Sequence, residues 1–223
     1  MKLSALFKPS YGIIATIIII LAIIPHFILP YWQHIIIYTL WFVYLCLAWS
    51  ISGMTGAFSL GHTIFLAAGA YAAILLFFHF GISPWLGMFA GAAAALMLSL
   101  AIGWVGFRLH VPGLAFAIIT LAFAVIAEAV FSGIGFLGLT EGFCYGFARN
   151  EPWNFLWVSR IPFYYIILGL TILVFVIWWL IQRSRLGLCF RAVHDNEPAA
   201  AAAGVDPIKY KLIALGISAV LTS

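Results

Sequence analysis

The feature that most constrains this chain is the absence of charge from its first half. Between Lys8 and Arg108 there is no Asp, Glu, Lys or Arg. An average soluble domain is about 25% charged, whereas this chain is 7% charged and 66% hydrophobic, with a mean hydropathy of +1.19. A soluble fold of 223 residues cannot cover so much apolar surface, so lipid is the solvent for most of it. The sequence predicts an all-α, polytopic transmembrane helical bundle.

Apolar stretches of about 20 residues, enough to cross a bilayer, are separated here by Pro, Gly, His and Gln. The N-terminal run begins like a signal peptide but lacks a small-residue cleavage site, so we interpret it as an uncleaved first span. The residues from Pro207 onward would form about 25 Å of helix, so we expect residues 1–223 to be one partial transmembrane domain. We predict six full spans and an incomplete seventh, at residues 12–29, 34–52, 62–80, 85–107, 113–134, 162–182 and 207–223.

The distribution of Lys and Arg predicts the orientation of the chain. With the N-terminus in the cytoplasm, only Arg149 and Arg160 lie outside, and this bias follows the positive-inside rule. Residues 135–161 are then an extracytoplasmic loop and residues 183–209 a cytoplasmic loop. The net charge of +4 therefore reflects membrane orientation and does not indicate nucleic-acid binding. The positive residues placed inside are Lys2, Lys8, Arg108, Arg183, Arg185, Arg191, Lys209 and Lys211.

The segment from Arg183 to Lys211 contains half of the charged residues of the chain. Leu186, Phe190 and Val193 share one face of a predicted first helix. Asp195 or Asn196 can cap a second, alanine-rich helix that ends at Gly204. A helix this short is marginal alone in water, so the segment is either held by another protein or is a solvated loop.

Three parts of the chain resemble a known family. The run "EPAAAAAG" at 197–204 resembles the Glu-Ala-Ala…Gly coupling loop of permease subunits of ABC importers. The longer segment "SRLGLCFRAVHDNEPAAAAAGVDPIKYKLIALGISAVL" resembles the branched-chain amino acid permease family, as do residues 52–76, residues 108–131 and the run "GLTEGF". The resemblance extends from about residue 35 to residue 223.

The resemblance implies a transmembrane permease subunit in a bacterial-type inner membrane. Its expected partners are a second homologous permease subunit, two cytosolic ABC ATPase subunits and an extracytoplasmic substrate-binding protein. ATP would bind to the ATPases, and this chain, which lacks a GxxxxGK[ST] loop, would need no cofactor and would not be an enzyme. The residues implied in ATPase coupling are Arg191, Glu197, Ala200 and Gly204.

The cargo implied is a branched-chain or similar amino acid, moved by alternating access. Urea and short amides are alternative cargoes, because related permeases share these motifs. Two further alternatives are a truncated chain that does not transport and an ion-coupled secondary carrier. The carrier interpretation is disfavoured because the six full spans contain no second charge to pair with Glu128.

Residues 52–62, "SGMTGAFSLGH", predict a broken helix. Glycines permit irregular backbone, which is tolerated at membrane depth only inside protein or around water. The segment therefore either lines the translocation pathway or forms a tight turn built for packing. The predicted pathway residues are Ser52, Gly53, Gly56, Ser59, Gly61, His62, Thr120 and Glu128.

Glu128 is the only charged residue inside the six predicted full spans. Because a carboxylate in hydrocarbon is costly, we expect it to face the bundle interior, a wet cavity or a partner subunit. Gly87 and Gly91 predict close helix packing, which we expect to be intramolecular. The histidines show no metal-binding spacing, and the three cysteines are expected to be free thiols.

Overall fold

The computed structural model of the chain describes residues 20–109, 111, 113–133 and 151–223. These residues are overwhelmingly helical, and their only strand-like pairing is one antiparallel bridge between Glu151 and Leu156. The predicted all-α class is therefore confirmed for the described part of the chain. The helices are η2 (Ile24–His26), α2 (Pro30–Gly53), α3 (Thr63–Phe80), α4 (Pro84–Arg108), α5 (Gly113–Gly133), η4 (Pro152–Asn154), α6 (Ile161–Arg183), α7 (Arg185–Asp195), α8 (Glu197–Ala202) and α9 (Pro207–Thr222).

Five helices, α2 to α6, are long and apolar enough to cross a membrane. They correspond to the predicted spans from 34–52 to 162–182. The first predicted span, 12–29, lies mostly outside the described residues, and its described end is helical only from residue 20 to residue 26. The total of six full spans plus an incomplete seventh therefore stays a prediction.

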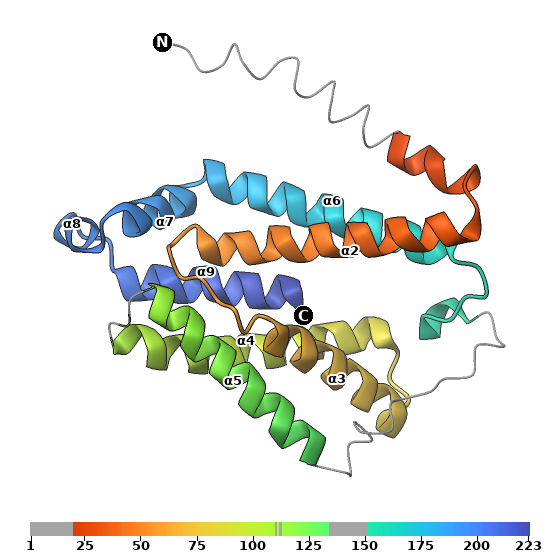
Figure 1. Cartoon of the computed structure of the whole chain (residues 1–223), viewed down its shortest axis with the longest axis horizontal. Helices are drawn as coiled ribbons and strands as arrows, with labels where there is room; N and C mark the ends of the chain where they lie inside the picture. The colour runs from red at the N-terminus through yellow and green to blue at the C-terminus, as the bar shows by residue number, and fades with distance from the viewer. Residues whose placement is uncertain (1–19, 110, 112, 134–150) are drawn as a thin grey trace.

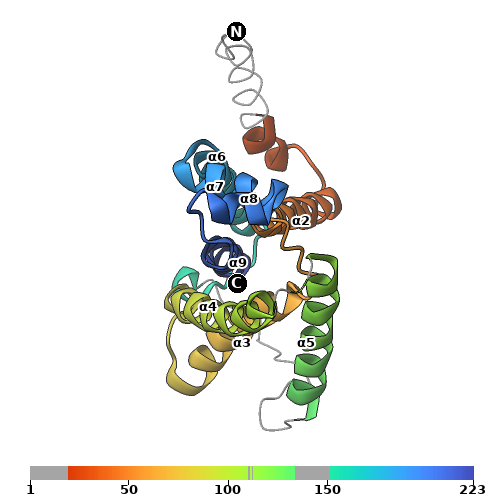
Figure 2. The same ribbon diagram turned by 90° about the vertical axis from the view of Figure 1, so that its left-hand side faces the viewer.

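Helix α9 occupies the middle of the bundle (Figures 1 and 2). It packs against α4 on one side and α2 on the other, and α6 covers the far side of α2. Its buried face includes Lys211, Leu215, Ser218 and Thr222, which recur at intervals of four, three and four residues as one helix face requires. The segment expected to be an incomplete span is thus the most buried helix of the described chain.

Small residues allow α3 and α4 to pack closely. A Cβ added at Gly91 would lie 2.7 Å from the carbonyl oxygen of Gly69, and one added at Gly87 would lie 3.0 Å from the Cα of Ala73. The prediction that this stripe packs within the chain is confirmed. Gly91 lies opposite Gly69 and Gly87 opposite Ala73, so the two helices are antiparallel. Continued to the first residue of α3, this alignment places Thr63 opposite residue 97, and α4 therefore extends for about three turns beyond the start of α3.

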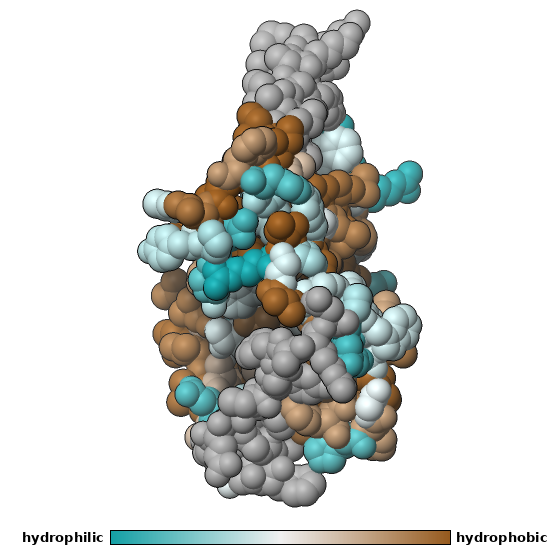
Figure 3. All heavy atoms as spheres, turned by 90° about the vertical axis from the view of Figure 1, so that its right-hand side faces the viewer, coloured by the Kyte–Doolittle hydropathy of each residue, from teal (hydrophilic) through white to brown (hydrophobic). Residues whose placement is uncertain are grey.

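Large apolar side chains remain exposed on the long helices, as expected for lipid-facing or subunit-facing surfaces. Figure 3 shows apolar residues over much of one end of the molecule, with polar residues scattered among them. Helix α5 contacts α3 and α4 only sparsely, and it lies to one side of the bundle (Figure 2).

The predicted loop 135–161 is described only from residue 151 onward. Its η4 turn is held against the start of α4, where Trp85 Nε1 donates a hydrogen bond to the carbonyl oxygen of Pro152 at 3.2 Å. Cys46 and Cys189 are free thiols, as predicted. Cys144 lies outside the described residues.

Candidate functional site

The broken segment, defined here as residues 54–62, leaves the end of α2 and runs back into the bundle (Figure 1). Its turn is held by two hydroxyls. Ser52 Oγ donates to the carbonyl oxygen of Ala57 at 2.7 Å, and Thr55 Oγ1 donates to that of Ser52 at 2.9 Å. Gly56 has φ +75°, a left-handed conformation that favours glycine. The predicted interruption of the helix is therefore present, and it is built from the Ser, Thr and Gly residues of the motif.

The far end of the broken segment packs on α5 without space for any side chain. A Cβ added at Gly61 would lie 1.9 Å from the carbonyl oxygen of Thr120. Thr120 Oγ1 accepts hydrogen bonds from the backbone N–H groups of Leu60 at 3.2 Å and Gly61 at 3.3 Å, and donates to Ala117 O. Buried backbone polar groups need such partners. Thr120 Oγ1 therefore takes the place of the backbone carbonyl groups that would accept these hydrogen bonds in a continuous helix.

His62 links the broken segment to α9 and α2. Ser218 Oγ donates to the carbonyl oxygen of Ala48 at 2.6 Å and lies 2.9 Å from His62 Nε2. A serine hydroxyl has one proton, so in this arrangement His62 Nε2 is the donor to Ser218. The other ring nitrogen, Nδ1, is buried and has no hydrogen-bond partner among the described residues, and the same holds for Ser59 Oγ. Buried polar atoms of this kind usually have a partner, so both carry unused hydrogen-bonding capacity at the broken segment.

A mostly apolar pocket of about 200 Å³ lies beside His62 at the start of α3. Small apolar groups bind in cavities of about this size. The pocket therefore suits a short aliphatic group with a polar group near the imidazole. Its lining residues are Phe42, Leu45, Cys46, Trp49, His62, Thr63, Leu66 and Thr222.

Seven of the eight predicted pathway residues gather at the broken segment, and Glu128 does not. Thr120 faces inward, but Glu128 follows eight residues later, which rotates it by about 80° around the helix axis. It is exposed among the described residues, so it does not face the interior of the described bundle, and a wet cavity or a partner subunit stays a prediction. Sequence reasoning missed Ser218, although a serine in the apolar run "IALGISAVL" was a visible signal.

We predict that Ser218→Ala lowers the stability of the protein by about 1–3 kcal/mol, since it leaves buried polar groups without partners. The matched control is Ser99→Ala, because Ser99 is equally buried but its hydroxyl bonds only within its own helix, to Leu96. Thermal unfolding in detergent measures both variants. Equal unfolding midpoints for the two would contradict the bridging role of Ser218.

A second cluster lies at the end of the bundle that carries α7 and α8 (Figure 1). Asn196 Oδ1 accepts from Ala199 N at 3.1 Å and caps α8, and Gly204 follows its end with φ +86°. Asp206 Oδ1 caps α9 by accepting from the N–H groups of Ile208 and Lys209. The predicted second helix and the predicted start of the next are confirmed. Between the two caps that the sequence left open, the structure selects Asn196.

The buried face of α7 differs from the predicted one. Phe190 and Val193 are fully buried, but Leu186 is 38% exposed. Gly187 takes the inward position, because a Cβ there would lie 2.2 Å from the carbonyl oxygen of Ile181. The close approach to the end of α6 therefore places Gly187, together with Phe190 and Val193, on the buried face, and the prediction for Leu186 was wrong.

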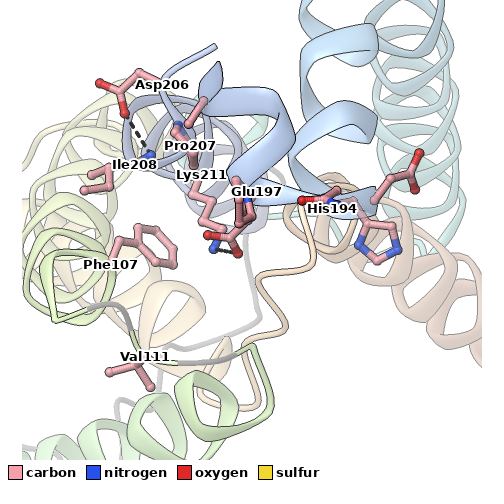
Figure 4. A pocket seen from close by; sticks show the side chains of 12 residues that line it. Phe107, Val111, His194, Glu197, Asp206, Pro207, Ile208 and Lys211 are labelled. Carbon is pink, nitrogen blue, oxygen red and sulfur yellow. Dashed lines mark hydrogen bonds and ion pairs between the residues drawn. The ribbon is translucent and has the colours of Figure 1, made fainter. Parts of the chain in front are cut away.

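The four residues implied in coupling have different orientations. Arg191 turns back toward α6, where it donates to Gln182 O at 2.7 Å, and Ala200 lies on the buried face of α8. Glu197 forms an ion pair with Lys211 of α9 (Figure 4). A cavity of about 690 Å³ lies beside this pair, between α8, the start of α9 and Phe107.

The α7–α8 cluster also touches the broken segment. A Cβ added at Gly56 would lie 2.9 Å from His194 Nδ1 of α7, and one added at Gly113 would lie 2.4 Å from Gly56 O. Gly56 is therefore enclosed between α7 and the start of α5. The two candidate sites are in direct contact.

The described residues form a helical membrane protein with a broken helix inside its bundle and a short capped helix at one end. Within the described ranges no three His, Cys, Asp or Glu residues come together as metal ligands. The family described as branched-chain amino acid transport system, permease component, matches residues 31–223. The chain belongs to this family, which is a family of transport permeases. Comparisons with curated proteins and with solved structures found no match.

Proposed function

We propose that this chain is the membrane permease subunit of an ATP-driven importer of branched-chain or chemically similar amino acids. The family match over residues 31–223 supports the permease role. The observation that carries the ATP-driven part is α8, a short helix capped at both ends at one end of the bundle. In this proposal a second, homologous permease subunit completes the pathway, and an extracytoplasmic binding protein delivers the cargo.

Helix α8 has the surface of a docking element for a cytosolic ATPase. Asn196 and Gly204 fix its two ends, and Ala200 anchors its inner face. Its outer face exposes Ala202 and neighbouring alanines, whose small side chains permit close approach by another protein. The end with α7 and α8 is then cytoplasmic, as is the N-terminus, and the membrane is a bacterial-type inner membrane.

The broken segment is the proposed part of the pathway. Its unpartnered polar atoms, Ser59 Oγ and His62 Nδ1, would contact a polar cargo group, while the neighbouring pocket would hold an aliphatic side chain. A cargo with an aliphatic chain uses this pocket better than urea or a short amide does. Alternating access would occur by rigid-body rocking around the site, with ATP bound only by the partner ATPases and no cofactor in this chain.

We expect Ala202→Trp to reduce the amount of ATPase that co-purifies with the chain at least tenfold, because a large side chain prevents close approach to α8. The measurement is a pull-down of the full chain through an N-terminal tag from its native membrane, with the retained ATPase quantified. Ala202→Ser is the matched control, since it changes the chemistry of the position but hardly its size. Equal recovery of ATPase with all three chains would contradict docking on this face of α8, and no ATPase with the wild type would contradict the proposed function.

A further inference from the structure

Lys211 is the one cation of α9 that points into the protein. It is 7% exposed, whereas Lys209, two residues earlier on the same helix, is exposed. The positive-inside rule requires only that both lysines lie on the cytoplasmic side, and it does not require Lys211 to be buried. Since burying an ammonium group is costly unless it is paired, the position of Lys211 depends on what surrounds it.

Two groups compensate the charge of Lys211. Glu197 of α8 accepts a hydrogen bond from Lys211 Nζ, and the face of the Phe107 ring of α4 lies 5.7 Å from the same atom, within cation–π range. Figure 4 shows these side chains converging from α8, α9 and α4. The side chain of Glu197 is 48% exposed and that of Lys211 is 9% exposed, so Glu197 is the more accessible partner, although both residues line the cavity of about 690 Å³.

The same face of α9 continues from this pair to the broken segment. Ser218 follows Lys211 by two turns, about 10 Å along the axis, and bonds to Ala48 O and His62. Leu215, between them, is fully buried. If α8 moves and pulls on Lys211, the force therefore acts on α9, which is packed along its length. Helix α9 is in turn bonded to the broken segment through Ser218.

We propose that Glu197 is a positioning residue that fastens α8 to α9 through Lys211, rather than a contact for the ATPase. The pair is the joint through which motion of α8 reaches α9 and, through Ser218, the broken segment. The fastening itself requires only this chain, while its role in coupling rests on the proposed function. The exposed alanines of α8 remain free to serve as the docking surface.

The test compares Glu197→Gln, Lys211→Met and the double variant in the full chain, because two residues that act as a unit give non-additive effects. The first measurement is the rate of trypsin cleavage after Arg183, Arg185, Arg191 and Lys209 of the purified chain alone, since all the variants keep these sites. Each single variant should be cleaved at least tenfold faster than the wild type, and the double variant no faster than the more sensitive single one. Asp195→Asn is the matched control, because its carboxylate is exposed at the same cavity.

The second measurement is uptake per ATP hydrolysed by the assembled importer. Each single variant should retain the ATPase in a pull-down but lose at least tenfold in uptake per ATP, and the double variant should lose no more than the worse single one. Wild-type cleavage rates in both single variants would overturn the fastening. Unchanged uptake per ATP, or losses that multiply in the double variant, would overturn the joint. Loss of the ATPase with Glu197→Gln but not with Lys211→Met would make Glu197 a docking contact. If no ATPase co-purified with the wild type, the proposed function would be refuted. The trypsin cleavage rates would still decide whether Glu197 and Lys211 fasten α8 to α9.

Discussion

Gly61→Ala is expected to abolish uptake and to lower the stability of the protein by about 3 kcal/mol or more. The added methyl carbon would lie 1.9 Å from the carbonyl oxygen of Thr120 and 2.4 Å from its carbonyl carbon. Both are backbone atoms, which cannot rotate away as the end of a side chain can. Relief therefore requires α5 to separate from the broken segment, which breaks the two hydrogen bonds that Thr120 Oγ1 accepts. Thermal unfolding in detergent and uptake by reconstituted importer measure the two effects.

The matched control for Gly61→Ala is Gly169→Ala. Gly169 lies in α6, and outside the backbone of its own helix no atom of the described residues lies within 4 Å of a Cβ added there. Alanine favours a helix over glycine by about 1 kcal/mol, so this control should be neutral or slightly stabilising. If the two variants unfold at the same temperature, the close approach of the broken segment to α5 is contradicted.

Local chemistry explains why the ends of the short helices could be predicted from the sequence. The start of α9 depends on Asp206 and Pro207, and the end of α8 depends on Gly204. Each of these residues affects only the backbone of residues close to it in the sequence. The small stripe at Gly87 and Gly91 was also predictable, because the spacing of four residues places both on one face. The glycines and hydroxyls of the broken segment similarly signalled an interruption of the helix.

Tertiary packing explains what could not be predicted. Helix α9 is central because α2 and α4 both pack on it, and nothing in a single apolar run specifies its neighbours. Glu197 lies in a motif that suggests an outward contact, but Lys211, fourteen residues later, turns it inward. The inward position of Gly187 in place of Leu186 depends on the approach of α7 to α6. Glu128 lies on a face of α5 that the described residues leave uncovered, so a single apolar run could not specify its environment.

Phe190→Ala is expected to release α7 and α8 from the bundle. The ring is fully buried in a cluster with Ile51, Ile181 and Ala214, and its removal should cost about 3–5 kcal/mol. Helix α7 has 11 residues and would be marginal without this anchor. Loss of the anchor should therefore unfold the short helices locally while the long helices remain inserted.

The adjacent thiol of Cys189, which is partly buried, reports this release. In a Cys46→Ser, Cys144→Ser background, Phe190→Ala should increase the rate of maleimide labelling at least tenfold. Leu188→Ala is the matched control, because Leu188 is 67% exposed on the same helix and its removal leaves the cluster intact. The same release should remove the ATPase from a pull-down, because α8 packs more extensively on α7 than on α9. Rapid labelling with the ATPase still bound would separate docking from the α7 anchor, whereas unchanged labelling would show that Phe190 does not hold α7 in place.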